Sequence, residues 1–446
     1  MGTSFIRGLP GLPRRLIFGA PFVALTVALY GCASSAPAET VSHPASADRA
    51  DAHALRTDIA FLASDALEGR GTGTTGNDSA AAYIAGRFRA LGLEPFESDF
   101  EQHFVAHPLT AHTVSPRSLR TQNVVALLPG RDSSLRGEFV IVGAHFDHLG
   151  RSTEGALDPD RKNAVRRGAD DNASGTAAVL ELARLFAVSP TRRSIVFVAF
   201  SGEELGLLGS EYFVSNSPIA LDSSIAMINF DMVGRLREDK LIVYGVSTAT
   251  ELPALLDSAN RATQREWPSP LRITALGDGY GPSDHSSFYA RSIPVLHFFT
   301  DLHDDYHRAS DVVAKINAKG EAHVVDVAEN VIRAIADRST RLTFVRSAAP
   351  PVASSREGSD VYLGSIPDMT AGAQGLRLTG IRAGSPAEEA GLVSGDIVVE
   401  FAGRAVKDLY DFSDALYSHK PGDTVSVVVL RNGDRKQFTV RLGKRG

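Results

Sequence analysis

The sequence predicts an α/β fold, in which helices flank a largely parallel mixed sheet, followed by a small β-rich domain. Three observations predict this architecture. Six short apolar segments have the character of buried strands, several of them alternate with helical patterns, and the alternation stops in a stretch rich in Pro, Ala and Ser near residue 350. Buried strands that alternate with helices are typical of a sheet covered by helices on both faces.

The first element predicted with a clear start and stop is a helix over residues 78–91. It follows a loop rich in Gly and Thr and ends before Gly92 and Pro95, which are common helix terminators. The run SGTAAVLELARLFAV has the period of a further helix. The predicted strands are NVVALLP, GEFVIVGA, SIVFVAF, SIAMINF, KLIVYG and IPVLHFF.

The break in the pattern predicts two domains. We expect the α/β domain over residues 51–343, a linker over residues 344–358 and the β-rich domain over residues 359–446. In the last segment short strands and turns surround one helical stretch, DLYDFSDALYSH. A chain of 446 residues, of which 43% are hydrophobic, can bury a sizeable core.

The N-terminus predicts export. Arg14 and Arg15 precede the apolar segment LIFGAPFVALTVALYG, which is too short and too interrupted to span a membrane but suits a signal peptide over residues 1–31. Cys32 is the only cysteine of the chain, and the residues before it, LYG, resemble the bacterial lipobox.

The lipobox resemblance implies a lipoprotein of the bacterial cell envelope, on the periplasmic face or in the outer membrane. The lipid on Cys32 would be its only membrane anchor, and residues 32–50, rich in Ala, Ser and Pro, would form a flexible tether. The alternative is a stray cysteine beside an ordinary cleavage site.

The charge pattern argues against nucleic acid as a partner. The net charge is −6 and the pI is about 6.1, and the Lys and Arg residues are scattered through the chain. No basic field that would attract a polyanion is therefore expected.

Candidate metal ligands follow four of the predicted strands. In open α/β sheets, ligands collect outside the carboxyl ends of the strands, so these side chains are expected to share one crevice. A further acidic pair directly precedes the helical run and can face the same crevice. The candidates are His145, Asp147, Glu203, Glu204, Asp231 and His307 after strands, with Asp170 and Asp171 before the helix.

Imidazoles combined with carboxylates suit zinc or a similar divalent ion, whereas a softer metal would need thiolates. One zinc ion needs only three protein ligands and an open position, so the surplus of carboxylates predicts two ions bridged by one of them. Each residue alone has a simpler explanation, because an Asp often caps a helix and a single His is often structural. The metal prediction depends on their coincidence at several strand ends.

Several segments together resemble the co-catalytic di-zinc aminopeptidases of clan MH over about residues 52–340. The resemblance implies a zinc exopeptidase fold and two zinc ions. It implies that His145 and Asp231 bind one zinc, that Glu204 and His307 bind the other, and that Asp171 bridges both. The segments that carry the resemblance are HFDHLG, GADDNASG, SGEELGLLGS, NFDMVGR and YHRASDVVAKIN, preceded by LASDALEGRGTGTTGN.

Successive side chains of a strand or tight turn point in opposite directions, so the adjacent Glu203 and Glu204 are not expected to do the same job. The resemblance implies a separate role for each. Glu204 would be a ligand, and Glu203 would be the general base that takes a proton from the attacking water and passes it to the leaving amine. Asp147 would orient His145 through a hydrogen bond. His148 and Asp170 would be neighbours of the ligands.

Two assignments stay open in the sequence. His285, in GPSDHSSF, competes with His307 as the last ligand, although YHRASD matches the family's final-ligand motif better. Tyr280, in GDGYGPSDH, is a candidate donor to the oxyanion, but a Tyr in such a loop is at least as often a packing residue.

The β-rich domain resembles a bacterial PDZ domain through YLGSIPD, IRAGSPAEEAGLVSGDIVVEFAGRAV and PGDTVSVVVLRNGDRKQFTV. In such domains a peptide adds a strand beside a groove, and backbone N–H groups of a loop bind its terminal carboxylate. Tyr362, Leu363 and Gly364 match that loop. The alternative is a packing domain that binds no peptide.

The expected function is that of a zinc-dependent exopeptidase of the cell envelope, an aminopeptidase that hydrolyses N-terminal residues of peptides. Carboxypeptidase or glutaminyl cyclase activity on the same scaffold is one alternative. A catalytically inactive PDZ-containing binding protein is the other.

Overall fold

The structure, a computed structural model, describes residues 49–107, 118–153, 156–158, 160–277, 279–281, 283–346, 361–367, 375–381, 384–406, 411–412, 415–416 and 418–444. The predicted signal peptide, Cys32 and nearly all of the predicted tether lie outside these residues, as does most of the predicted linker, so they stay predictions. Among the helices of the described residues, none combines the length and the apolar character needed to cross a membrane.

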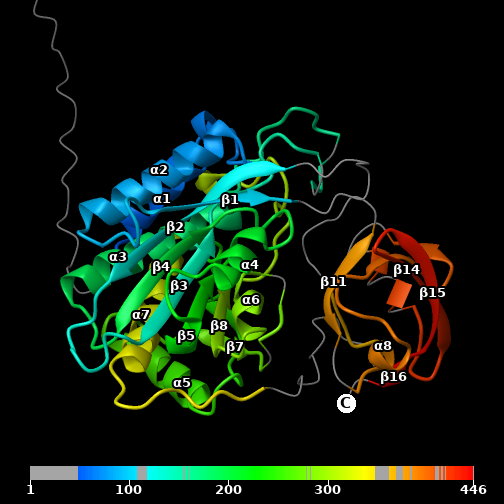
Figure 1. Cartoon of the computed structure of the whole chain (residues 1–446). Helices are drawn as coiled ribbons and strands as arrows, with labels where there is room; N and C mark the ends of the chain where they lie inside the picture. Colours follow the sequence, from blue (N-terminus) through cyan, green and yellow to red (C-terminus); the bar gives the residue numbers. More distant parts are fainter. Residues whose placement is uncertain are drawn as a thin grey trace, which may run out of the picture. The chain divides into compact units, whose positions relative to one another are not determined.

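The N-terminal domain contains a mixed sheet with the predicted parallel centre (Figure 1). Strand β3 runs parallel to both β4 and β5, and β5 runs parallel to β8. At one edge β1 and β2 are antiparallel to their neighbours, and at the other edge β6 is antiparallel to β8 and parallel to β7. In sheet order the strands are β1 (Glu101–Ala106), β2 (Leu119–Leu128), β4 (Ser194–Phe200), β3 (Phe139–His145), β5 (Ser224–Phe230), β8 (Val295–Phe299), β6 (Lys240–Tyr244) and β7 (Arg272–Ala275).

Helices cover both faces of this sheet. Alternate residues of its strands accordingly pack in two separate hydrophobic cores, one on each face. Val140 and Val142 of β3 pack in the core of the larger helical layer, whereas Ile141 packs in the core on the opposite face. The larger layer contains α1 (Ala52–Leu62), α2 (Thr75–Ala90), α3 (Gly175–Val188), α5 (Leu252–Ala262) and α7 (Ala318–Ala336), and the smaller layer contains α4 (Leu208–Ser215) and α6 (His285–Tyr289).

The two predicted helices are present, and the first of them begins three residues before its predicted start. The helix predicted over residues 78–91 is α2, which begins at Thr75 because the Thr74 hydroxyl accepts the N–H of Asn77 and caps the first turn. Helix α3 follows an irregular turn, η2 (Ala169–Ser174), which contains the acidic pair of GADDNASG. The other short turns are η1 (Asp65–Leu67), η3 (Leu221–Ser223), η4 (Thr263–Arg265) and η5 (Val313–Lys315).

The C-terminal domain is β-rich, as predicted, and has its own hydrophobic core around Val398, Phe401 and Val427. Of the predicted helical stretch DLYDFSDALYSH, residues 408–410, 413–414 and 417 lie outside the described residues. The described elements are β9 (Val361–Tyr362), β10 (Ser365–Pro367), β11 (Leu376–Ile381), α8 (Pro386–Glu389), β12 (Ile397–Phe401), β13 (Arg404–Ala405), β14 (Thr424–Arg431), β15 (Asp434–Arg441) and β16 (Gly443–Lys444).

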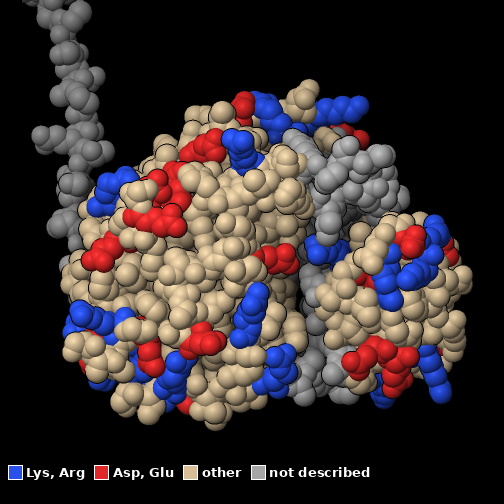
Figure 2. All heavy atoms as spheres, in the orientation of Figure 1, with Lys and Arg blue, Asp and Glu red and all other residues tan. Residues whose placement is uncertain are grey.

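The charged surface agrees with the scattered charges of the sequence. On the face shown in Figure 2, Lys and Arg side chains are interspersed with Asp and Glu side chains, and neutral surface separates them. On the described part of this face the Lys and Arg side chains stand in separate small groups.

Candidate metal centre

The parallel centre of the sheet positions the candidate ligands. His145 is the last residue of β3, Glu203 and Glu204 follow β4, and Asp231 follows β5. Because β3 lies between β4 and β5 and runs parallel to both, the carboxyl ends of the three strands open at one edge of the sheet. His307 reaches the same edge from the loop after β8.

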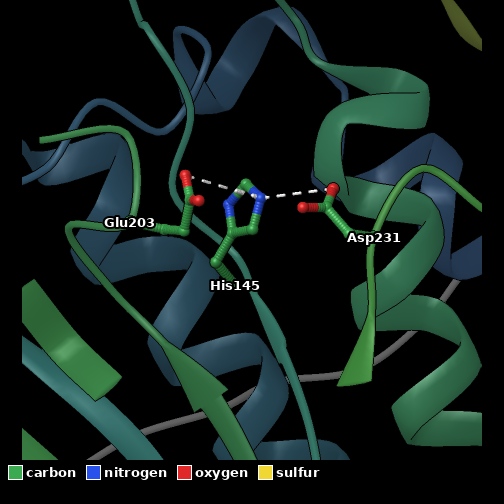
Figure 3. Close-up of side chains that lie close together, drawn as sticks. All are labelled: His145, Glu203 and Asp231. Atoms are coloured by element: carbon green, nitrogen blue, oxygen red, sulfur yellow. Dashed lines mark ion pairs between the residues drawn. The ribbon is translucent and has the colours of Figure 1, made fainter. Parts of the chain in front are cut away.

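Two groups of side chains converge there. One consists of His145, Glu203 and Asp231, and the other of His148, Asp171 and Glu204, and in each group the potential ligand atoms lie within 4.8 Å of one another. Figure 3 shows the first group, with the imidazole of His145 between the two carboxylates. These groups differ from the predicted assignment, which made Glu203 a base, His148 a neighbour and Asp171 a bridge.

Interatomic distances separate ligand pairs from other contacts. Two ligands of one tetrahedral zinc ion, each bonded at about 2.0–2.2 Å, lie ~3.3 Å apart. The His145 Nε2 atom is 3.5 Å from Asp231 Oδ1 and 3.5 Å from Asp171 Oδ1. The His307 Nε2 atom is 3.2 Å from Asp171 Oδ2 and 3.1 Å from Glu204 Oε2.

Two other contacts do not fit that spacing. Glu203 Oε2 is 3.9 Å from His145 Nε2, which is long for two ligands of the same ion. His148 Nδ1 is 2.6 Å from Glu204 Oε1, which is a hydrogen-bond distance. The spacing therefore favours Asp231, Asp171, Glu204 and the two histidines His145 and His307 as ligands.

The donor set fits divalent cations. The side chains of the five favoured residues are at most 14% exposed. Asp171 Oδ2, Glu204 Oε2 and Asp231 Oδ1 are buried and have no hydrogen-bond partner, although each lies near an imidazole nitrogen. Buried carboxylate oxygens without a donor are costly unless a cation satisfies them, and oxygen and imidazole donors in this arrangement suit zinc.

The two adjacent glutamates have opposite electrostatic surroundings. Burial, together with the charges of Glu204 and Asp284, raises the pKa of Glu203 well above its ordinary value, although His145 opposes this rise. Burial would also raise the pKa of Glu204, but His307 and His148 outweigh burial and hold that pKa well below its ordinary value. These surroundings suit Glu203 to carry a proton and Glu204 to remain an ionised carboxylate.

Asp147 contacts His145 through a different atom from the one expected. The Nδ1 atom of His145 lies 3.2 Å from the main-chain oxygen of Asp147, whereas the Asp147 carboxylate is 3.8 Å away. This carboxylate instead accepts the Thr72 hydroxyl, at 2.8 Å, and the main-chain N–H of Glu203, at 3.2 Å. The predicted support for His145 is thus a main-chain bond, and the Asp147 side chain positions the segment of Glu203.

His285, the competing candidate for the last ligand, belongs to neither group. Its ring is fully buried and stacks on His297, with ring centroids 4.3 Å apart. Burial and the neighbouring His297 lower the pKa of His285 well below its ordinary value, so the ring is neutral. The His307 assignment is favoured because His307 lies beside two of the carboxylates.

Tyr280, the candidate donor to the oxyanion, packs against another aromatic ring. Its ring packs edge-on against Tyr289, at a centroid distance of 4.8 Å, and the described residues that line the pocket at the metal centre do not include it. Tyr244, His297, Phe299, Leu302 and Tyr306 line this pocket instead. The predicted oxyanion role of Tyr280 is therefore not favoured by its packing.

Two residues that the sequence analysis did not single out support the ligand loops. Arg70 is fully buried and donates to the main-chain oxygens of residues 62, 146, 167 and 168. Asp311 accepts the N–H groups of Asp170 and Asp171, at 2.8 and 3.1 Å, through one carboxylate oxygen. The sequence contains a feature that could have pointed to each of them. Arg70 is the one charged residue of the loop GRGTGTTGN, and Asp311 ends the motif YHRASD.

The comparison with known families decides the identity of this domain. Peptidase family M28 matches residues 123–332, and the PDZ domain family matches residues 352–442. The N-terminal domain is therefore a peptidase family M28 domain. The C-terminal domain is a PDZ domain.

Two relatives of the chain are named as an aminopeptidase and as a leupeptin-inactivating enzyme. The aminopeptidase YwaD of Bacillus subtilis is 28% identical over 204 residues, which cover 44% of the chain and 41% of that protein. Leupeptin-inactivating enzyme 1 of Streptomyces exfoliatus is 25% identical over 435 residues, 94% of the chain and 88% of that enzyme. The chain thus spans less than half of the first relative and most of the second.

A solved structure shows the same fold as the M28 domain. A Zn-dependent exopeptidase from Parabacteroides distasonis superposes with a TM-score of 0.54, over 65% of this chain and 99% of that one, at 18% identity. The predicted zinc exopeptidase fold is therefore confirmed.

The predicted peptide-binding loop of the PDZ domain is held in place by its neighbours. Leu363 is buried in the domain core, and its main-chain oxygen accepts the N–H of Ala387 at 2.9 Å. Gly364 has φ +85°, and a Cβ atom there would lie 2.2 Å from the Cβ of Ser385. Glycine is therefore required at this position for both conformation and space.

Proposed function

We propose that this M28 protein is a zinc-dependent aminopeptidase that holds two zinc ions and hydrolyses N-terminal residues of peptides. The observation that supports two ions is the placement of Asp171. Its Oδ1 atom lies 3.5 Å from His145 and its Oδ2 atom lies 3.2 Å from His307, so one carboxylate contacts both ligand histidines. A carboxylate placed in this way can bridge two ions.

Each ion would have three protein ligands. His145, Asp231 and Asp171 would hold one, and Glu204, His307 and Asp171 would hold the other. When bound, zinc polarises a scissile carbonyl and lowers the pKa of water. The remaining chemistry depends on side chains of the chain itself.

Glu203 is the proposed proton carrier. It is buried beside the first ligand group, and its carboxylate is farther from His145 than the ligand carboxylates are. Its raised pKa suits a group that accepts a proton from water and returns it to the leaving amine. The bond from its N–H to Asp147 holds this carboxylate's segment in place.

The pocket beside the centre is the proposed site of the N-terminal side chain of the substrate. Three aromatic side chains and one leucine line it, together with His297, which burial keeps neutral by lowering its pKa to about 4. Apolar walls with a few polar groups are typical of small-ligand sites. The lining residues are Tyr244, Phe299, Leu302 and Tyr306.

The first prediction tests the exopeptidase assignment. The protein should release the N-terminal residue of a peptide with a free amine, and N-acetylation of that peptide should abolish the release. Mass spectrometry of the products distinguishes the alternatives, because release from the other end would show a carboxypeptidase and cyclisation of an N-terminal glutamine would show a cyclase. Equal hydrolysis of the free and acetylated peptides would contradict the proposal.

The second prediction concerns the PDZ domain, which we propose as a docking site for the C-terminus of a peptide or protein partner. A peptide with a free terminal carboxylate should bind the full-length protein, and its C-terminal amide should bind at least about tenfold more weakly, because a charge-assisted hydrogen-bond set is lost. Isothermal titration with the Glu203→Gln variant avoids hydrolysis of the peptide. Equal affinities would indicate a packing domain.

A further inference from the structure

His148 lies against the second ligand group without a role in the proposed mechanism. Its side chain is fully buried, and its Nδ1 atom is 2.6 Å from Glu204 Oε1 and 3.6 Å from Asp171 Oδ2. The other oxygen of Glu204, Oε2, lies 3.1 Å from His307 Nε2. The two oxygens of Glu204 therefore face two different histidines.

The contact between His148 and Glu204 is a hydrogen bond and not a pair of ligands. Two donors of one tetrahedral zinc ion would be ~3.3 Å apart, and 2.6 Å is too short for that arrangement. A carboxylate that binds a cation is ionised and only accepts hydrogen bonds, so the proton lies on Nδ1 of His148. The Nε2 atom of His148 is buried and has no hydrogen-bond partner.

The ring of His148 is fixed from three sides. Its main-chain N–H donates to the oxygen of Arg70 at 3.3 Å, and its ring meets the ring of His307 edge-on at 5.8 Å. Gly168, with φ +55°, closes the third side, because a Cβ atom there would lie 2.5 Å from Cγ of His148. A ring held in this way cannot rotate Nδ1 out of reach of Glu204 without moving the loop of Gly168.

We propose that His148 is a positioning residue, which donates from Nδ1 to Glu204 Oε1 and so directs Oε2 toward the second ion. This inference rests on the proposed two-ion function. Groups that orient a metal ligand typically contribute 10- to 100-fold to metal affinity, roughly the effect expected here.

Three substitutions test this role. In His148→Asn the side-chain amide places an N–H near the position of Nδ1, and an amide nitrogen, unlike Nδ1, does not bind zinc. In His148→Gln the amide reaches the position of Nε2, and in His148→Leu no donor remains. Zinc affinity is measured by chelator competition on the metal-free protein, and thermal unfolding of the metal-free form reports whether each variant folds.

We expect His148→Asn to bind both ions with nearly wild-type affinity, and His148→Gln and His148→Leu to bind one ion roughly 10- to 100-fold more weakly. Loss of affinity in His148→Asn as large as in His148→Leu would show a ligand and overturn the proposal. Wild-type affinity in all three variants would overturn it as well. If the wild-type protein itself bound no zinc, the proposed function would fail instead.

Discussion

Replacing Glu203 with glutamine is expected to lower kcat by roughly 10²- to 10⁴-fold while both zinc ions stay bound. Glutamine has nearly the same shape but cannot accept the proton that the reaction transfers. The ions should remain because Glu203 is 3.9 Å from His145 Nε2, whereas the favoured ligand pairs are 3.1 to 3.5 Å apart. Steady-state kinetics and elemental analysis of the same preparation check both parts.

The matched control is the neighbouring substitution Glu204→Gln. It changes the same chemical group one residue later, and it should weaken metal binding as well as activity, because the Oε2 atom of Glu204 faces His307. If Glu203→Gln lost an ion and Glu204→Gln kept both, the assigned roles of the two glutamates would have to be exchanged.

Replacing Asp171 with asparagine is expected to weaken the binding of both ions, each by more than about 100-fold, since even residues that only orient a ligand contribute up to that amount. The reason is that the Asp171 carboxylate contacts both ligand histidines. Activity should fall with metal content. Chelator competition on the metal-free variant measures the loss independently of turnover.

Asp170→Asn serves as the control for Asp171→Asn. Asp170 is equally buried in the same turn, but its oxygens accept from Gly234 N–H, Ser174 and His303 and do not face the ligand histidines. Asparagine can keep most of these bonds, so this variant should retain two ions. Loss of both ions from Asp170→Asn alone would mean that the turn, and not the bridging carboxylate, controls metal binding.

The positions of the strand-end ligands could be predicted because they follow from general rules. Apolar runs predict buried parallel strands, and parallel strands bring His145 and Asp231 to one edge whatever the loops do. The roles of Asp147 and His148 could not be predicted in this way. They depend on rotamers and on main-chain atoms, such as the oxygen of Asp147, which no residue pattern specifies.

The fold likewise has elements that the sequence pattern predicts and elements that it does not. The strongly apolar strands β3, β4 and β5 were predicted with nearly correct limits. Strand β1 (Glu101–Ala106) was not, because half of this edge strand is solvated and its residues, EQHFVA, lack a continuous apolar run. The packing of Tyr280 against Tyr289 could not be predicted from the sequence either, because it depends on where α6 and the loop before it lie in the fold.

The central claim is that two ions share the carboxylate of Asp171. A crystal structure of the zinc-loaded protein, with anomalous difference maps measured above and below the zinc absorption edge, tests it most directly. We expect two peaks roughly 3.5–4 Å apart, with one oxygen of Asp171 bound to each, and Glu203 bound to neither. A single peak, or two peaks bridged by another residue, would contradict the account.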